Sequence, residues 1–243
     1  MRFPISPDII FATAIISAVP AKKLTSTIPI VSAALADAVN LGLIASETRP
    51  GGNVTGIEPY VAGLPAKQME FAREVVPGTT KVGLLTNLQD PKAPPQVQEL
   101  KQAAKAFELD VVEADANVAE EIAPALQALS EQRANVVIVL QTSLFLSERQ
   151  RIGAAALQER LPIVCGYREH VIAGGLISYG VDLRWCYHRV AYFVDKILHG
   201  TAPGDLPVEF PTSMMLSINL RTAKALGIAV SPTLLGLADE TME

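Results

Sequence analysis

The chain has 243 residues, of which 49% are hydrophobic and 19% are charged, and its mean hydropathy is +0.29. A chain of this length and composition buries an ample core in one large or two small domains, which excludes an intrinsically disordered protein. The formal net charge is −5 and no basic run occurs, which argues against a nucleic-acid partner.

An apolar run from Ile9 to Val19 near the N-terminus is loosely similar to a secretory signal. Arg2 is the single basic residue before this run, and Pro4 and Asp8 stand where a positively charged region belongs. We therefore interpret residues 9–14 as a buried strand rather than as part of a leader. No run of 18 or more apolar residues is present, so no membrane-spanning helix is predicted.

Short apolar runs alternate with amphipathic stretches along the rest of the chain. Most runs are rich in β-branched residues and almost continuously apolar, as is typical of strands covered by helices on both sheet faces. This alternation predicts an α/β protein with right-handed βαβ units and parallel sheets. The predicted strands are residues 9–14, 28–33, 81–86, 110–113, 136–140, 163–165 and 176–179.

Apolar residues at helical spacing lie between these strands and predict amphipathic helices with one buried face. The longest of these helices follows the last predicted strand and ends at Gly200. The residues expected on the three buried faces are Val97, Leu100, Ala104 and Phe107; Ile122, Leu126 and Leu129; and Leu183, Tyr187, Val190, Ala191, Val194, Ile197 and Leu198.

Three segments rich in turn-forming residues are predicted joints between two lobes: residues 49–56, 179–182 and 201–207. The glycines Gly51, Gly52 and Gly56 lack the spacing of a dinucleotide fingerprint, and no Lys-Ser or Lys-Thr pair follows them. A hinge or turn is therefore the preferred interpretation over a phosphate site. The triplet that begins at Asn53 matches a glycosylation sequon, which often arises by chance.

Ligands of open parallel sheets bind beyond the carboxyl ends of the strands, and polar residues gather after the predicted strands here. Hydroxyls, amides, one arginine and two tyrosines suit a small polar or zwitterionic ligand, and Arg168 can clamp a carboxylate with two hydrogen bonds. The alternative is that strand ends are polar wherever loops meet water. The candidates are Ser32, Asp37, Thr86, Asn87, Gln141, Thr142, Ser143, Tyr167, Arg168, Glu169, Ser178 and Tyr179.

No clear catalytic, metal or cofactor signature is present. Cys165 ends a predicted strand five residues before His170, so a Cys–His nucleophile is conceivable, but we prefer a buried, inert thiol. Cys186 and His188 lie two positions apart on a predicted helix and face different sides, which is poor geometry for one metal. We therefore predict no catalytic residue, no metal and no cofactor.

Several segments together resemble the ABC-transporter substrate-binding proteins that include tryptophan- and tyrosine-type receptors. The resemblance covers nearly the whole chain in the family's order. It is carried by residues 25–31 (TSTIPIV), 49–56 (RPGGNVTG), 167–169 (YRE), 174–180 (GGLISYG), 218–227 (INLRTAKALG), 232–235 (PTLL) and 238–240 (ADE).

This resemblance implies a type I periplasmic-binding fold with two Rossmann-like lobes, residues 1–56 plus 181–206 and residues 57–180 plus 207–243. It implies a periplasmic, non-catalytic receptor whose lobes close on a small carboxylate-bearing solute, with aromatic amino acids as candidates, and which delivers it to an inner-membrane ABC permease. The cleft residues implied are Asp37, Asn87, Thr142, Tyr167, Arg168 and Tyr179, to which the strand-end pattern adds Ser143.

Two other functions stay open. One is a cofactor-free racemase that uses Cys165 and Cys186 across a cleft. The other is the effector-sensing part of a regulator, although no DNA-binding helices precede the fold.

The chain departs from the family at its start, because members usually begin with a signal peptide and two further βα units. We therefore expect an incomplete first lobe, and the missing signal peptide makes export doubtful. An incomplete sheet exposes a strand edge and apolar faces, so we expect self-association into a homodimer through this lobe.

Overall fold

The computed structural model describes residues 7–243, and its chain divides into two compact units. The first unit comprises the described residues up to Val61 together with Leu183–Ser213, and the second comprises Ala62–Asp182 and Met214–Glu243. Arg2 and Pro4, which entered the leader interpretation, lie outside the described residues. Within residues 7–243 no helix has the length and apolarity needed to cross a membrane.

A seven-stranded sheet forms the centre of the second unit, with the strand order β10-β9-β8-β7-β6-β4-β5. The strands from β5 to β8 are mutually parallel, β9 runs antiparallel to β8, and β10 is parallel to β9. The strands are β4 (Lys81–Thr86), β5 (Asp110–Asp115), β6 (Val136–Val139), β7 (Ile163–Cys165), β8 (Ile177–Gly180), β9 (Met215–Asn219) and β10 (Glu240–Met242).

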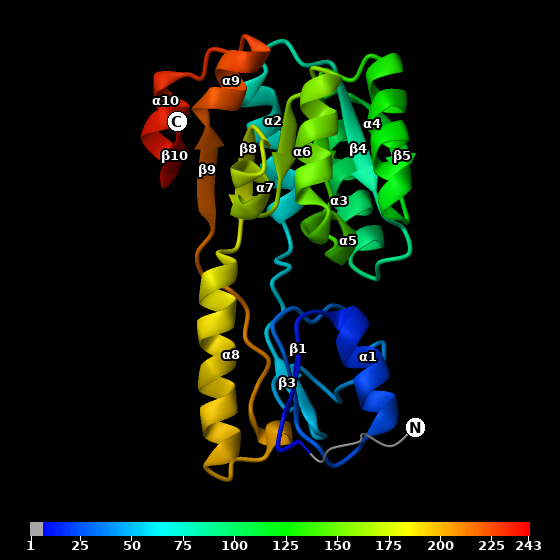
Figure 1. Cartoon of the computed structure of the whole chain (residues 1–243), viewed down its shortest axis with the longest axis vertical. Coiled ribbons are helices and arrows are strands. Elements are labelled where there is room, and N and C mark those ends of the chain that lie inside the picture. The colour runs from blue at the N-terminus through cyan, green and yellow to red at the C-terminus, as the bar shows by residue number, and fades with distance from the viewer. Residues whose placement is uncertain (1–6) are drawn as a thin grey trace. The chain divides into compact units, whose positions relative to one another are not determined.

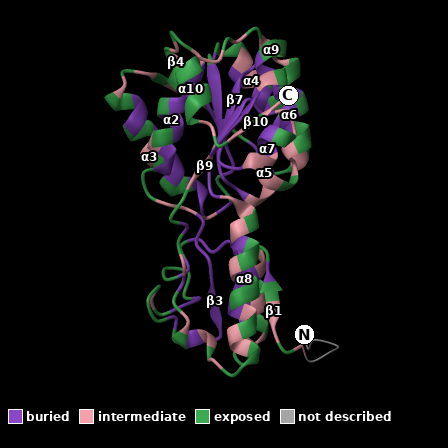
Figure 2. Cartoon of the chain, turned by 90° about the vertical axis from the view of Figure 1, so that its left-hand side faces the viewer, coloured by how far each residue is buried: buried purple, intermediate pink, exposed green. Residues whose placement is uncertain are grey.

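Helices cover both faces of this sheet, which explains why its central strands are apolar throughout. One layer holds α2 (Leu64–Val75) and α3 (Ala93–Ala106), and the opposite layer holds α4 (Ile122–Glu131), α6 (Arg149–Gln158) and α7 (Arg168–Ile172) (Figure 1). Figure 2 shows the buried strands between helices whose outer faces are exposed. The remaining helices of this unit are η1 (Ala119–Glu121), α5 (Ser143–Ser147), α9 (Leu220–Leu226) and α10 (Pro232–Leu237).

The first unit contains a smaller sheet with the order β1-β2-β3, and its three strands are all parallel. Figure 1 shows α1 and α8 on opposite sides of this sheet. On the α8 side, the ring of Phe11 meets the ring of Tyr187 edge to face at 6.1 Å. The elements are β1 (Ile10–Ala12), α1 (Ile15–Leu24), β2 (Ile30–Ser32), β3 (Val54–Gly56), α8 (Leu183–Leu198) and η2 (Pro203–Asp205).

The predicted helix faces are confirmed in α3 and α4 but only in part in α8. Val97, Leu100 and Ala104 are buried on α3, with Phe107 packed against the core, and Ile122, Leu126 and Leu129 are buried on α4. On α8 the buried residues are Cys186, Val190 and Phe193, whereas Tyr187, Ala191 and Leu198 are exposed. The prediction was wrong for those three because both sides of α8 carry apolar residues.

The predicted α/β fold with parallel sheets is confirmed, and one antiparallel pairing, between β8 and β9, adds to it in the larger sheet. Strands β9 and β10 were missed, and β9 pairs with β8 in antiparallel register from Ile177↔Ile218 to Gly180↔Met215. Both strands give a weak sequence signal. Ser217 and Asn219 interrupt the apolar run of β9, and β10 has only three residues, Glu-Thr-Met.

Segment 49–56 was predicted to be a joint between lobes, but it also contains a strand. Its last three residues form β3, which pairs with β2 through Ile30↔Val54 and Ser32↔Gly56. Asn53 holds the start of this strand, because its Nδ2 donates to the carbonyl oxygens of Thr25 (3.2 Å) and Ile28 (2.7 Å). Its Oδ1 accepts a hydrogen bond from Lys22 Nζ at 2.6 Å. The buried Asn53 amide therefore joins two loops, a structural role that its sequence context did not predict.

Candidate functional site

The carboxyl edge of the seven-stranded sheet brings together six of the seven predicted site residues. Strands β4, β6, β7 and β8 are parallel and end at this edge, while β9 and β10 run the other way and begin there. Glu240, the first residue of β10, therefore joins the residues that follow β7. The six residues are Asn87, Thr142, Ser143, Tyr167, Arg168 and Tyr179. Asp37 belongs to the first unit.

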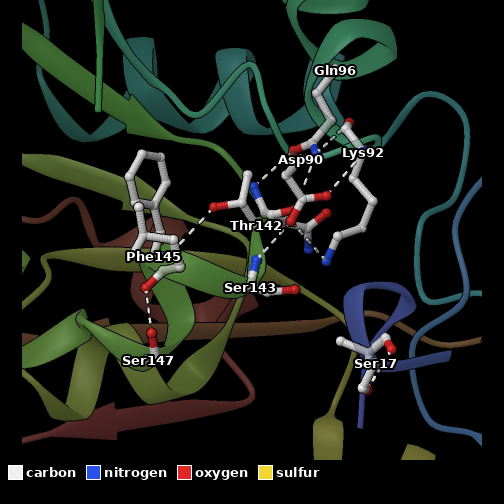
Figure 3. Close-up of polar contacts among 11 residues, drawn as sticks. Ser17, Asp90, Lys92, Gln96, Thr142, Ser143, Phe145 and Ser147 are labelled. Carbon is white, nitrogen blue, oxygen red and sulfur yellow. Dashed lines mark hydrogen bonds and ion pairs between the residues drawn. The ribbon is translucent and has the colours of Figure 1, made fainter. Parts of the chain in front are cut away.

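The turn between β4 and α3 places a charged pair at this edge. Asp90 is 4% exposed and Lys92 is 5% exposed. The Oδ1 atom of Asp90 accepts a hydrogen bond from the backbone N–H of Lys92 (3.0 Å), and Oδ2 accepts one from the backbone N–H of Ser143 (2.9 Å). Lys92 Nζ lies 4.0 Å from the same Oδ2 atom (Figure 3). Asp90 therefore fixes the turn, the start of α5 and the Lys92 ammonium against one another.

Two glutamines tie three neighbouring loops together beside this pair. Gln96 Oε1 accepts a hydrogen bond from the backbone N–H of Gln141 (2.8 Å), and Gln96 Nε2 donates to the carbonyl oxygens of Lys92 (2.7 Å) and Gln141 (3.2 Å). Gln141 Nε2 in turn donates to the carbonyl oxygen of Gly166 (3.1 Å). Because every contact lies inside the protein, the loops after β4, β6 and β7 form one rigid, polar framework.

Thr142 and Ser143 begin α5 directly after β6. The Thr142 hydroxyl caps this helix, because its Oγ1 accepts a hydrogen bond from the Phe145 N–H at 3.3 Å. The Ser143 Oγ atom is buried and has no hydrogen-bond partner among the residues that the structure describes. A buried hydroxyl without a partner costs free energy, and such a group commonly faces a ligand or water.

Asn87 follows β4 and is buried. Its Nδ2 donates to the carbonyl oxygen of Ala116 (2.9 Å) and to Asn117 Oδ1 (3.1 Å). Both acceptors follow β5, so the Asn87 side-chain donors hold the ends of two strands together.

Arg168, the predicted carboxylate clamp, already binds a carboxylate of the chain. Its Nε and Nη2 donate to the two carboxylate oxygens of Glu240, with Nη2 2.5 Å from Oε1. These hydrogen bonds raise the pKa of the guanidinium above its ordinary value. The neighbouring Glu169 Oε2 is buried without a hydrogen-bond partner in residues 7–243.

The two predicted tyrosines lie in different surroundings. Tyr167 is 3% exposed, and its ring stacks on the His170 imidazole with ring centres 6.1 Å apart. The ring of Tyr179 is partly buried and packs 5.0 Å from the ring of Phe71 on α2. Both rings are therefore held by neighbours of the second unit.

Asp37 lies in an exposed turn of the first unit with a backbone φ of 51°. Its Oδ1 accepts a hydrogen bond from Asn40 Nδ2 at 2.5 Å. Among L-residues, aspartate and asparagine tolerate this left-handed conformation best, so the residue suits the turn itself.

The sequence interpretation missed Asp90, Lys92 and Gln96. They occupy a proline-rich turn and the first turn of α3, where charged and amide residues are normally solvated. One signal was available, because Asp90 and Lys92 follow the same strand end as Asn87, which the strand-end rule did select.

The alternative Cys–His nucleophile is not favoured by the surroundings of either group. Cys165 is fully buried, and burial raises the pKa of its thiol, so the reactive thiolate is disfavoured. His170 is also buried, and desolvation lowers the pKa of its imidazole to about 4. Its Nε2 lies 3.1 Å from the carbonyl oxygen of Phe145. Residues 7–243 contain no cluster of three or more His, Cys, Asp or Glu side chains suited to a metal ion.

Two α/β units built on parallel strands define a fold of the periplasmic-binding-protein type, and comparison with solved structures agrees. A conserved domain protein from Vibrio cholerae superposes with a TM-score of 0.89 at 29% identity, over 97% of this chain and 79% of that one. An ABC domain from Streptococcus pneumonia, solved in complex with L-Trp, superposes equally well at 23% identity, over 98% of this chain and 79% of that one. At 23% identity, the similarity to the Streptococcus pneumonia domain establishes the fold alone.

The family described as ABC transporter substrate binding protein matches residues 5–242, so the chain belongs to this family. A curated relative, the tyrosine-binding protein of Clostridioides difficile, is 29% identical over 219 residues, which are 90% of this chain. The chain spans 63% of the length of that relative.

Proposed function

We propose that this protein is the solute-binding component of a bacterial ABC importer and that it captures a small carboxylate-bearing molecule without catalysis. The observation that carries the proposal is the buried polar framework at the carboxyl edge of the seven-stranded sheet, where the Ser143 hydroxyl has no partner among the described residues. Small-molecule sites combine a mainly apolar and aromatic lining with a few precisely placed polar groups, and the Ser143 hydroxyl is a candidate for such a polar group.

An aromatic amino acid is the solute class we favour. Support comes from the curated relative, whose name states tyrosine binding. The proposed site residues are Asp37, Asn87, Thr142, Ser143, Tyr167, Arg168 and Tyr179. Of these, Ser143 has the strongest support because its hydroxyl lacks a partner among residues 7–243, whereas Arg168 would have to exchange Glu240 for the ligand.

The partner in this proposal is an ABC permease of the membrane, which the ligand-loaded protein engages on the periplasmic or outer side. Family membership supports this partner and this location. The racemase alternative loses support because Cys165 and Cys186 are both buried.

Thermal unfolding against a panel of solutes tests the proposed function. L-tyrosine, L-tryptophan, L-leucine and their D-enantiomers are added at increasing concentration, and a ligand at a hundredfold its Kd stabilises the fold by about 2.7 kcal/mol. A selective, saturable shift with an aromatic L-amino acid supports the proposal. No shift with any member, checked by calorimetric titration, contradicts the ligand class.

Self-association through the first unit stays a prediction. In the described residues β1 is an outer strand of the three-stranded sheet, and Phe11 on β1 and Ile16 on α1 are 46% and 59% exposed. Sedimentation at tens of micromolar checks it, and a clean monomer would contradict it.

A further inference from the structure

We infer that the groove between α3 and the edge strand β5 (the α3–β5 groove) is a docking surface for an extended segment of a partner protein. The segment adds to the sheet beside β5 and carries an apolar and an acidic residue four positions apart. This inference goes beyond the proposed function, because the groove belongs to the second unit alone and involves none of the proposed site residues.

The α3–β5 groove has a volume of about 590 Å³ and two chemically different ends. Leu88, in the turn after β4, is 53% exposed and forms the apolar end together with Pro94 and Val97 from the start of α3. Lys101 and Lys105 follow on the same face of α3, because residues three or four positions apart lie above one another on a helix. An occupant therefore meets apolar side chains at one end and ammonium groups at the other.

Lys105 supplies the attraction for an acidic group. Two lysines and one glutamate line the groove, a net charge of +1 in a chain of net charge −5. Lys101 Nζ lies 2.7 Å from Glu113 Oε1 on β5, so these two charges compensate each other. Lys105 is exposed, and its ammonium has no ion-pair or hydrogen-bond partner in the part of the chain that the structure describes. The uncompensated charge of the groove is therefore that of Lys105, and it favours an acidic side chain on the occupant.

Strand β5 has an open backbone edge beside the groove. It is the last strand of the seven-stranded sheet and pairs with β4 alone. The backbone N–H of Asp110 donates to the carbonyl oxygen of Thr80, on the β4 side, at 2.9 Å. Backbone groups alternate in direction along a parallel strand, so the N–H groups of Val111, Glu113 and Asp115 point away from β4. An edge of this kind is a template for the addition of a further strand.

The dimensions of the groove set the spacing of the two groups on the partner segment. At the apolar end, the backbone N–H of Leu88 donates to Asp115 Oδ1 at 3.0 Å, so this end lies beside the end of β5. From Pro94 to Lys105 the helix rises by about 16 Å. Four residues of an extended strand advance by about 13 Å and return the side chain to the same face. The long, flexible lysine side chain covers the difference, so an apolar residue at Leu88 and an acidic residue at Lys105 stand four positions apart.

The test adds a capped, threonine-rich peptide, with leucine and glutamate four positions apart, to the whole chain and follows amide hydrogen exchange by NMR. A matched peptide carries lysine in place of glutamate. We expect the glutamate peptide to slow exchange at Val111, Glu113 and Asp115, because an added strand gives these N–H groups acceptors. The lysine peptide should have a much smaller effect.

Two charge-reversal variants separate docking at the groove from a general effect of net charge. K105E should weaken binding of the glutamate peptide by about fivefold, since an attraction becomes a repulsion. K224E makes the same change on the exposed surface of α9, outside the groove, and should bind this peptide as the wild type does. L88S should weaken both peptides, because it removes the exposed apolar side chain at the other end of the groove.

Three results would overturn the inference. The first is that neither peptide slows exchange along β5, which would leave the charges of this edge as a protection against aggregation. The second is that the lysine peptide binds as well as the glutamate peptide, or that K105E binds as the wild type does. The third is slowed exchange that needs no peptide and grows with protein concentration, which would assign the edge to a second copy of the chain. None of these results bears on solute binding.

Discussion

The guanidinium of Arg168 binds the carboxylate of Glu240 through two parallel hydrogen bonds, although 72 positions separate the two residues in the sequence. Arg168 is the first residue of α7, and Glu240 is the first residue of β10, a three-residue strand at the edge of the larger sheet. The pair therefore fastens a short edge strand to the centre of the second unit, in addition to any role that Arg168 has toward ligand.

Replacing Arg168 with lysine should lower the free energy of unfolding by roughly 1–2 kcal/mol, because a lysine ammonium cannot reproduce the two parallel hydrogen bonds. Urea denaturation measures the change. The control is K67A, which removes the exposed Lys67–Glu70 pair and should cost less than about 0.5 kcal/mol. Equal stability of R168K and the wild type would show that the pair is not stabilising.

The buried imidazole of His170 should make the fold acid-sensitive. Its folded pKa of about 4 lies below the ordinary 6.5, so the unfolded chain takes up the proton first as the pH falls. Stability is then fully present above pH 6.5 and is lost progressively toward pH 4, by up to about 3 kcal/mol from this group. Urea midpoints of the wild type and H170Q across this range measure the effect, and H170Q should show the flatter profile. Parallel profiles would contradict the prediction.

Gly56 should not tolerate a side chain. Its φ is +147°, and a Cβ there would lie 2.1 Å from the carbonyl oxygen of Ser32 on the neighbouring strand β2. G56A should destabilise the protein by about 3 kcal/mol, since both strain and overlap with backbone atoms must be relieved. The matched control is G236A, in α10, where nothing lies within 4 Å of the added Cβ and alanine favours the helix by roughly 0.5 kcal/mol. A tolerated G56A, judged by thermal unfolding, would disprove the close approach.

Asn53 should behave as a structural residue of the first unit. N53A removes the two hydrogen bonds to Thr25 O and Ile28 O and leaves Lys22 Nζ without this acceptor. We expect a loss of about 2–3 kcal/mol in the free energy of unfolding, because these groups are largely shielded from water. N40A, on the exposed turn at Asp37, is the control and should be close to neutral. If N53A were as stable as the wild type, the hydrogen bonds of Asn53 would not stabilise the first unit, and the prediction would be wrong.

Much of the second unit was predictable because its elements repeat local patterns. The bounds of β4 and β7 agree with the predicted residues 81–86 and 163–165, since short, mainly apolar runs are typical of strands whose two faces are covered by helices. Thr142 and Ser143 were found by the strand-end rule, which needs only the chain order. Lys92 and Asp90 were missed because a charged turn rich in proline has the composition of a solvated loop.

The sequence by itself determined the α/β class, the family and the strands that end at the candidate site, because periodicity and motif order are properties of the chain alone. Only the tertiary structure decided that Glu240 meets Arg168, that Asp90 and Lys92 are buried, and that β9 runs antiparallel. The ion pair and the strand pairing join residues far apart in the sequence, and the burial of Asp90 and Lys92 is produced by segments far from them in the sequence. They depend on which faces and loops pack together, and local composition does not encode that choice.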